Sequence, residues 1–179
     1  HNLSKITDSA DLMYFVLLAF HPLRLEEVLG LKWADVDTAA KTIHVRRAVT
    51  HPDRNKPETK ETKTAASVRD IGLSAIALPH LVPGNPDEFV CGGKKPLSYT
   101  QVRRMNDRIC RQLEFAGTIT PQRFRTTVLT DLYDRTKDIK QTQAAAGHTT
   151  SAMTLKHYVK GRCNNPHEAA AAVDALYSA

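Results

Sequence analysis

The groups with the most chemical potential in this chain gather in one polar stretch, residues 147–158. The stretch begins with Gly147-His148 and ends at Tyr158. A tyrosine hydroxyl, with an ordinary pKa of ~10, becomes a useful nucleophile only where cations stabilise the phenolate and the charge that develops on its target. On this stretch alone, the more ordinary interpretation is a half-buried packing tyrosine. The chemistry therefore depends on cations supplied by the rest of the chain.

Three cationic residues elsewhere are candidates for that role. Arg24 lies in a predicted helix, where the alternative is a weak surface ion pair with Glu27 at i,i+3 spacing. Lys63 lies in a polar segment, where the alternative is a solvated loop lysine. Arg125 follows Thr120-Pro121, a capping residue and a proline that together predict the start of a helix.

Four further arginines fall on one predicted helix, residues 99–116: Arg103, Arg104, Arg108 and Arg111. They suit a surface that positions the phosphates of a nucleic acid. A solvated helix face shared with Asp107 and Glu114 is an equal alternative.

The length of 179 residues predicts one domain, or one domain with a small appendage. The composition is that of a soluble globular protein, because 41% of the residues are hydrophobic and 25% are charged. The formal net charge of +6 suggests a polyanionic partner. Three scattered cysteines without a CxxC pair argue against a disulfide framework or zinc ribbon and fit a reducing cytoplasm. No cluster of acidic residues argues for a metal site, and the longest apolar run, residues 12–20, is too short to span a bilayer.

The hydrophobic pattern predicts several helices and a pair of alternating strands. Ser9-Ala10-Asp11 offers a cap for the first helix, and Gly30 offers one for the end of the second. Two alternating segments, 42–49 and 67–73, predict one hairpin whose long basic loop, 50–64, carries Lys63 near its return. Further elements are expected as a short strand at 88–90 and helices at 9–20, 23–29, 74–81, 99–116, 120–135, 139–146, from about 150 to Tyr158, and 168–177.

Four segments resemble, in order, the motifs of the tyrosine recombinase (phage integrase) family. They are residues 23–37 around Arg24, 62–69 around Lys63, 120–127 around Arg125, and 147–161 with its Thr-Leu-x-x-Tyr ending. Together these segments span nearly the whole chain. The resemblance implies a mostly helical α+β domain with a small antiparallel sheet. It also implies the catalytic domain of a site-specific DNA recombinase that cleaves and rejoins strands through a 3′-phosphotyrosyl intermediate.

The resemblance also implies a role for each matched residue. Arg24 and Arg125 would clamp the phosphate, and His148 would add a hydrogen-bond donor. Lys63 would protonate the departing 5′ oxygen, with Lys60 as its competitor, and Tyr158 would be the nucleophile. Arginines would provide the electrostatic stabilisation, so neither a metal nor another cofactor is expected.

Two positions depart from the family pattern. Gln122 stands where the family usually has a histidine, and Pro22-Leu23 stands where it commonly has a glycine-containing turn. An amide can hold a phosphate oxygen but cannot shuttle a proton. Two alternatives therefore stay open: a catalytically impaired DNA-binding remnant, and an unrelated basic nucleic-acid-binding domain.

The expected partner is double-stranded DNA, contacted by Arg103, Arg104, Arg108 and Lys60. The resemblance further implies tetramers on DNA and a source in a mobile element such as a prophage. Residues 1–179 would form the catalytic domain, with residues 164–179 as a C-terminal helix that docks on a neighbour. An N-terminal DNA-clamping domain would lie outside this chain.

Overall fold

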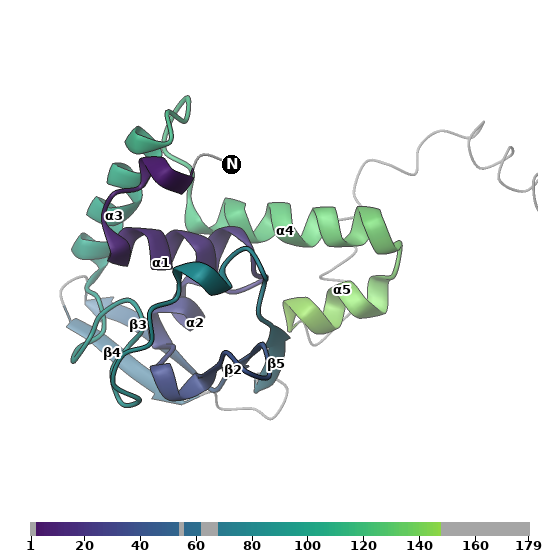
Figure 1. The fold of residues 1–179 in the computed structure, drawn as a ribbon, viewed down its shortest axis with the longest axis horizontal. Coiled ribbons are helices and arrows are strands. Elements are labelled where there is room, and N and C mark those ends of the chain that lie inside the picture. The colour runs from purple at the N-terminus through teal and green to yellow at the C-terminus, as the bar shows by residue number, and fades with distance from the viewer. Residues whose placement is uncertain (1–2, 54–55, 62–67, 148–179) are drawn as a thin grey trace, which may run out of the picture.

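The computed structural model describes residues 3–53, 56–61 and 68–147 and shows a mixed helical and antiparallel fold (Figure 1). Three residues to which the sequence assigns chemistry, Lys63, His148 and Tyr158, lie outside the described residues, as does the expected C-terminal helix. The elements in chain order are η1 (Leu3–Lys5), α1 (Ser9–Ala19), α2 (Leu25–Gly30), η2 (Trp33–Asp35), β1 (Val36–Asp37), β2 (Thr42–Val45), β3 (Arg47–Asp53), β4 (Lys56–Glu61), β5 (Arg69–Gly72), η4 (Leu78–His80), α3 (Tyr99–Gln112), α4 (Pro121–Thr136) and α5 (Ile139–Ala146).

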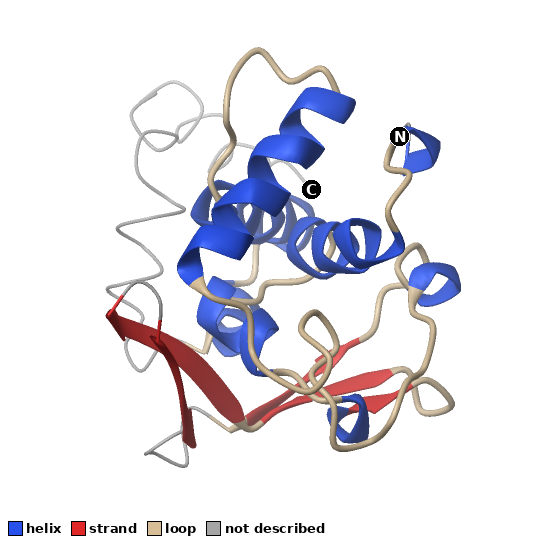
Figure 2. Ribbon diagram, turned by 90° about the vertical axis from the view of Figure 1, so that its left-hand side faces the viewer, coloured by secondary structure: helices blue, strands red, loops and turns tan. Residues whose placement is uncertain are grey.

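The strands form two small antiparallel sheets rather than one. The first has the order β1-β2-β5, with Ile43 opposite Ile71, and the second is the pair β3-β4, with Val49 opposite Thr59. Figure 2 shows the α-helices stacked on one side of the strands. The strands thus form a base over which the helical body is built.

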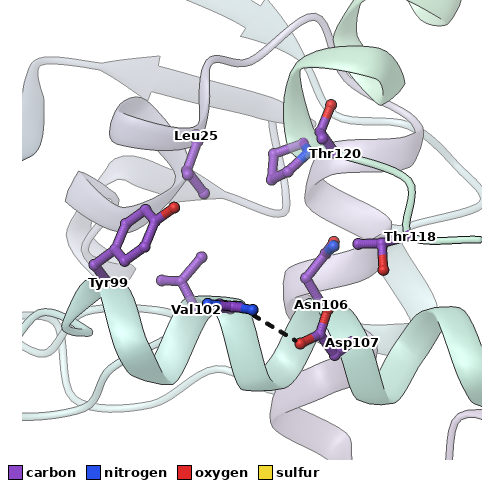
Figure 3. A pocket seen from close by; sticks show the side chains of 9 residues that line it. Leu25, Tyr99, Val102, Asn106, Asp107, Thr118 and Thr120 are labelled. Atoms are coloured by element: carbon purple, nitrogen blue, oxygen red, sulfur yellow. Dashed lines mark ion pairs between the residues drawn. The ribbon is translucent and has the colours of Figure 1, made fainter.

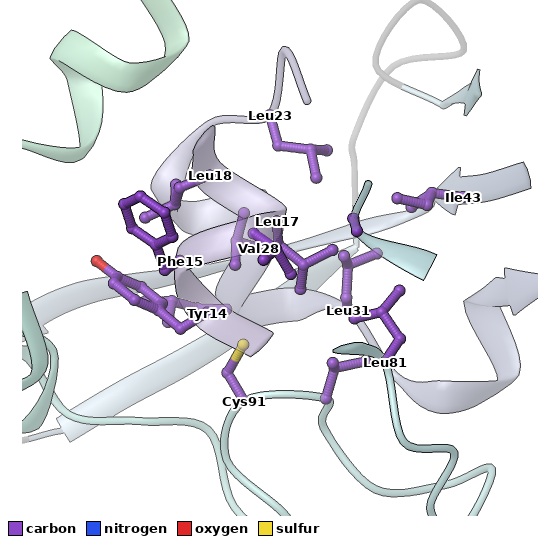
Figure 4. Packing of buried hydrophobic residues seen from close by; sticks show 14 of the residues in the cluster. Tyr14, Phe15, Leu17, Leu18, Leu23, Val28, Leu31, Ile43, Leu81 and Cys91 are labelled. Atoms are coloured by element: carbon purple, nitrogen blue, oxygen red, sulfur yellow. The ribbon is translucent and has the colours of Figure 1, made fainter. Parts of the chain in front are cut away.

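A single large core joins this base to the helices. Helix α1 is apolar on most of its faces and is buried, with Tyr14, Leu17 and Leu18 nearly inaccessible to solvent. These side chains pack with Leu23 and Ile43 from the neighbouring segments (Figure 4). The core therefore fixes the turn between α1 and α2, which contributes to the candidate site.

Helices α4 and α5 form an antiparallel pair beside this body (Figure 1). Their contact has its own small cluster, in which Leu129 and Ala146 are fully buried. Helix α4 ends where Lys137 adopts a left-handed conformation (φ 53°), and Asp138 caps α5 by accepting a hydrogen bond from the Gln141 amide at 3.0 Å. This geometry returns the end of α5 to the N-terminal half of the chain.

The predicted hairpin is only partly correct. Segment 42–45 does pair with 69–72, but residues 47–53 leave that sheet and pair with 56–61, which were predicted as a loop. The β3-β4 hairpin carries polar residues on both faces, so it lacks the apolar alternation by which a strand is recognised in a sequence. Arg47 takes an inward position because its guanidinium pairs with the buried carboxylate of Asp35.

Helix boundaries differ from the predictions at several places. The predicted helix at 74–81 is a turn followed by a 3-10 helix, because Pro79 supplies no amide donor. Helix α3 ends at Gln112 instead of residue 116, since Glu114 has a positive φ of 56°. Asp8, not the predicted Ser9, caps α1, with its carboxylate accepting from the Ala10 amide at 2.9 Å.

Gly30 is not the predicted left-handed cap, and the second helix begins at Leu25 rather than at residue 23. A β-carbon at Gly30 would lie 2.8 Å from the Arg47 carbonyl oxygen, so glycine is needed for close packing of α2 on β3. The expected short strand at 88–90 is an isolated antiparallel bridge between Phe89 and Lys32. Across the described ranges, no helix is long and apolar enough to cross a membrane.

Candidate active site

Arg24 occupies the N-cap position of α2, directly after the turn that follows α1. Its Nη1 donates to Oε1 of Glu27 at 2.8 Å, and its backbone amide donates to Oε2 of the same carboxylate at 2.7 Å. The expected i,i+3 pair therefore exists, but Glu27 is buried, with only 5% of the residue exposed. The Arg24 side chain is 37% exposed, so its guanidinium is bound by Glu27 on the protein side and faces solvent on the other.

Arg69 at the start of β5 is the second partner of Glu27. Its Nη1 and Nη2 donate to Oε1 and Oε2 at 2.8 and 2.9 Å, a bidentate arrangement. Burial alone would raise the pKa of the Glu27 carboxyl, but the hydrogen bonds and charge of Arg69, with a smaller contribution from Arg24, outweigh it and lower the pKa. Glu27 is therefore a carboxylate shared between two arginines.

Arg125 approaches the same region from the second turn of α4. Only 2% of this residue is exposed, and its guanidinium donates to the backbone carbonyls of Pro22 and, at 2.6 Å, of Ala146. Arginine stays protonated when buried, so a permanent cation is held between the α1–α2 turn and the end of α5. The residues that it joins are 103 and 21 positions away in the sequence.

The two arginines meet at the turn that ends α5. Nη2 of Arg24 lies 3.4 Å from the carbonyl oxygen of Gly147, the residue after the Ala146 acceptor of Arg125. Gly147 has a left-handed φ of 60°, and a β-carbon there would lie 3.0 Å from the Arg69 guanidinium carbon. The turn therefore requires glycine for both conformation and space. It places residue 147 against Arg24 immediately before His148 in the chain.

His21 fixes the position of the chain beside the arginine cluster, which is formed by Arg24, Arg69 and Arg125. Its ring is fully buried; Nδ1 donates to the Leu17 carbonyl at 3.2 Å, and Nε2 accepts from the Ser74 amide at 3.0 Å. Burial lowers the pKa of His21, so the ring is neutral, as this bonding pattern requires. His21 thereby anchors the chain next to Pro22, an acceptor of Arg125.

The arrangement is suited to binding an anion with a planar array of donors. Arg24, Arg69 and Arg125 concentrate positive charge around one turn, and the Glu27 carboxylate lies between Arg24 and Arg69. Guanidinium groups match the geometry of phosphate oxygens and need no metal ion to do so. Within residues 3–53, 56–61 and 68–147, no group of three or more His, Cys, Asp and Glu side chains could hold a metal ion.

Gln122 lies one helical turn before Arg125 and is exposed at the start of α4. Lys60 projects from the β3-β4 hairpin with 51% side-chain exposure, and its ammonium lies 3.9 Å from Glu58. Among the described residues, no hydrogen bond joins Gln122 or Lys60 to the arginine cluster. Their functional roles stay predictions.

The α3 arginines are exposed, as predicted, but they differ in their surroundings. Arg103 is 75% exposed and lies 3.9 Å from Asp107, on the wall of a pocket between α3 and the start of α4 (Figure 3). Arg104 is also exposed. Arg108 instead donates from Nε and Nη2 to both oxygens of the fully buried Asp11, each at 2.6 Å. Arg108 therefore has a structural role in joining α3 to α1, and its DNA contact stays a prediction.

Sequence reasoning missed three residues that organise the cluster: His21, Glu27 and Arg69. Glu27 was considered only as a surface partner of Arg24, because its burial and its second arginine depend on β5, 42 residues along the chain. Arg69 occurs in the segment quoted around Lys63, yet strand alternation gives no sign of a buried ion pair.

The fold and its arginine cluster define an α+β domain with a cationic site, and comparison with known proteins gives its family. The sequence matches the phage integrase family over residues 2–164, which is most of the chain. The chain belongs to the phage integrase family.

Individual relatives agree with that membership. The tyrosine recombinase XerC of Chlamydia trachomatis is 26% identical over 156 residues, covering 85% of this chain and 47% of the relative. The chain thus spans about half the length of the curated relatives that it matches.

Solved structures share the fold. The integrase of transposon Tn1549, in complex with transposon right end DNA, superposes with a TM-score of 0.73 at 23% identity and covers 99% of this chain and 63% of that one. The XerA recombinase superposes with a TM-score of 0.68 at 16% identity, covering 97% and 60% of the two chains. At these identities, the similarity establishes the fold alone.

Proposed function

We propose that this chain is the catalytic domain of a site-specific DNA recombinase that acts through a tyrosine nucleophile. The observation that carries the proposal is the meeting of Arg24 and Arg125 at the Ala146–Gly147 turn, from segments distant in sequence. A phosphodiester under attack develops negative charge on its non-bridging oxygens, and fixed guanidinium groups stabilise that charge. Membership of the phage integrase family supports the same reaction class.

The proposed reaction is a transesterification. The Tyr158 oxygen bonds to the phosphorus and gives its proton to solvent, the bond from phosphorus to the 5′ oxygen breaks, and Lys63 protonates that leaving oxygen. Arg24, Arg125 and His148 bind the non-bridging oxygens. The 3′-phosphotyrosyl ester conserves the energy of the phosphodiester, and the 5′ hydroxyl of another strand reverses the step.

The proposed partner is double-stranded DNA, with Arg103, Arg104, Arg108 and Lys60 as candidate backbone contacts. We further propose that the domain works in the cytoplasm as a tetramer on DNA, for a mobile element. In that assembly, residues 164–179 would dock on a neighbouring copy and a separate domain would clamp the DNA. The net charge of +6 supports a polyanionic partner.

The test is covalent trapping on a nicked suicide substrate, from which the cleaved end diffuses away. The parent protein should form an adduct that resists denaturants, whereas Tyr158→Phe should retain DNA binding and form none. Tyr99→Phe is the matched control, because Tyr99 is an exposed tyrosine of α3, and it should form the adduct. An undiminished adduct in Tyr158→Phe would refute the assignment of the nucleophile.

A second candidate function is DNA binding without cleavage, and Gln122 is the observation that favours it. This amide occupies a position where the family usually has a titratable imidazole. Salt-sensitive DNA retention without an adduct, in both the parent and Gln122→His, would establish that reading instead.

A further inference from the structure

We infer that Arg69 is a positioning residue that orients Arg24 through Glu27 and supports the Gly147 turn. The inference rests on the proposed function, because it assigns Arg69 a part in the same anion site. Its basis is geometric. Arg69 has only 9% of its side chain exposed and directs both terminal nitrogens to the Glu27 carboxylate at 2.8 and 2.9 Å.

Glu27 transmits this constraint to Arg24. The carboxylate oxygen that accepts from Nη1 of Arg69 also accepts from Nη1 of Arg24 at 2.8 Å. Its other oxygen accepts from Nη2 of Arg69 and from the backbone amide of Arg24, at 2.9 and 2.7 Å. Each oxygen thus accepts one hydrogen bond from each arginine. Because the Arg69 guanidinium fixes the position of the carboxylate, it also fixes the position of the Arg24 main chain and side chain.

Arg69 also contacts the opposite side of the cluster. Its guanidinium carbon would lie 3.0 Å from a β-carbon at Gly147, the residue whose carbonyl oxygen faces Nη2 of Arg24 at 3.4 Å. A shift of the Arg69 side chain would therefore move the Glu27 carboxylate and remove a contact of the Gly147 turn at the same time. The buried Arg69 guanidinium thus contacts both Glu27 and the Gly147 turn, the two groups that Arg24 also contacts.

A lysine at this position is the discriminating change. Arg69→Lys keeps the positive charge beside Glu27 but replaces the planar fork with a single ammonium, which cannot bind both oxygens in the same way. We expect single-turnover adduct formation to slow by about 10- to 100-fold, the scale of a displacement near 1 Å at a reacting centre. DNA affinity at fixed salt should change by less than about threefold, because exposed phosphate contacts dominate it.

A matched control separates positioning from stability. Arg47→Lys alters another arginine whose carboxylate partner, Asp35, is 1% exposed. Among the described residues, the hydrogen bonds of the Arg47 side chain go to Asp35 and the Gly30 carbonyl, not to Glu27 or Arg24. Both variants are compared as rates per folded molecule, with the folded fraction taken from urea unfolding. Arg47→Lys should cleave at the parental rate, whereas equal slowing in the two variants would show a general effect of stability and overturn the inference.

A double variant tests whether Arg69 acts through Glu27. If it does, Glu27→Gln combined with Arg69→Lys should be no slower than the slower single variant, because both changes interrupt the same connection. If the rate losses of the two single variants multiply in the double variant, Arg69 acts independently of Glu27 and the inference is contradicted.

A readout without cleavage distinguishes failure of this inference from failure of the proposed function. Side-chain NMR of Arg24, assigned by Arg24→Lys, should show slowed rotation of its terminal nitrogens in the parent and in Arg47→Lys, and averaging in Arg69→Lys. If the parent forms no adduct but this change appears, the proposed chemistry fails and the positioning role stands. Unchanged Arg24 signals in Arg69→Lys would refute the positioning role whatever the activity.

Discussion

Replacing Glu27 with glutamine is expected to destabilise the fold far more than a single polar substitution usually does. The carboxylate accepts four hydrogen bonds, two from Arg24 and two from Arg69. Glutamine keeps the shape but offers one acceptor oxygen, and its amide group would face guanidinium donors. Losing about two of these bonds, at roughly 1.5 kcal/mol each for charged partners, predicts a loss of about 3 kcal/mol in the free energy of unfolding.

Most of this loss of stability should come from the hydrogen bonds between Glu27 and Arg69. The Arg69 side chain is 9% exposed, whereas that of Arg24 is 37% exposed and solvent weakens its ion pair. The assay is urea unfolding at neutral pH, with Glu26→Gln as the control. Glu26 is the exposed neighbour on the same helix and should change stability by less than about 0.5 kcal/mol. A loss below about 1 kcal/mol in Glu27→Gln, with an unchanged denaturant slope, would refute the shared-carboxylate reasoning.

The same substitution has a predictable pH dependence. The pKa of Glu27 is lowered from 4.5 in the folded protein, because the two arginines outweigh the effect of burial. A carboxyl group with a lowered folded pKa contributes its full stability above the unfolded pKa and loses it as the pH falls through the folded value. The stability advantage of the parent over Glu27→Gln should therefore be constant above pH 4.5 and shrink below it. A difference that stays constant down to strong acid would contradict this sign.

Three further changes probe other parts of the molecule. Asp11→Asn should lower the free energy of unfolding by about 1–3 kcal/mol in urea titrations, because it weakens the bidentate pair with the partly exposed Arg108; a neutral result would mean that this pair adds nothing. Gly147→Ala should cost about 1–2 kcal/mol, measured by thermal unfolding, because its φ of 60° is left-handed, and Gly117→Ala is the control at a position with open space. Gln122→Ala should raise the activation free energy for adduct formation by about 1–3 kcal/mol while Gln122→His stays at or above the parental rate; a parental rate in the alanine variant would remove Gln122 from the site.

The sequence predicted best where local signals agree with the tertiary fold. Helix α5 was predicted with its observed limits, since its apolar face ends at Gly147 and no competing strand pattern overlaps it. Helix α4 was predicted to within a residue at each end because Thr120-Pro121 marks its start. In contrast, the pairing of β3 with β4 was missed, because β4 consists of polar residues and one proline and so has no hydrophobic period.

The candidate site was predictable as separate residues but not as a connected arrangement. Arg24 and Arg125 were identified through motifs that resemble a known family. The link between them depends on a carbonyl at Ala146 and on the Arg69–Glu27 pair, which form only when α5 and β5 return to α2. Long-range hydrogen bonds of this kind leave no periodic pattern in the sequence.

The β3-β4 hairpin has a consequence for how the fold opens. The β3 strand is fixed, with Val49 fully buried and the Arg47 carbonyl closely packed above Gly30, whereas Thr59 and Lys60, its pairing partners on β4, are exposed. A two-stranded ribbon without a third strand has little stability of its own. Amide hydrogen exchange on the β4 side should therefore proceed by local fraying, at rates that core-destabilising substitutions leave unchanged, while the amide of Ile43 in the three-stranded sheet reports global unfolding. The segment that carries Lys60 can thus change its conformation while the arginine cluster keeps its geometry.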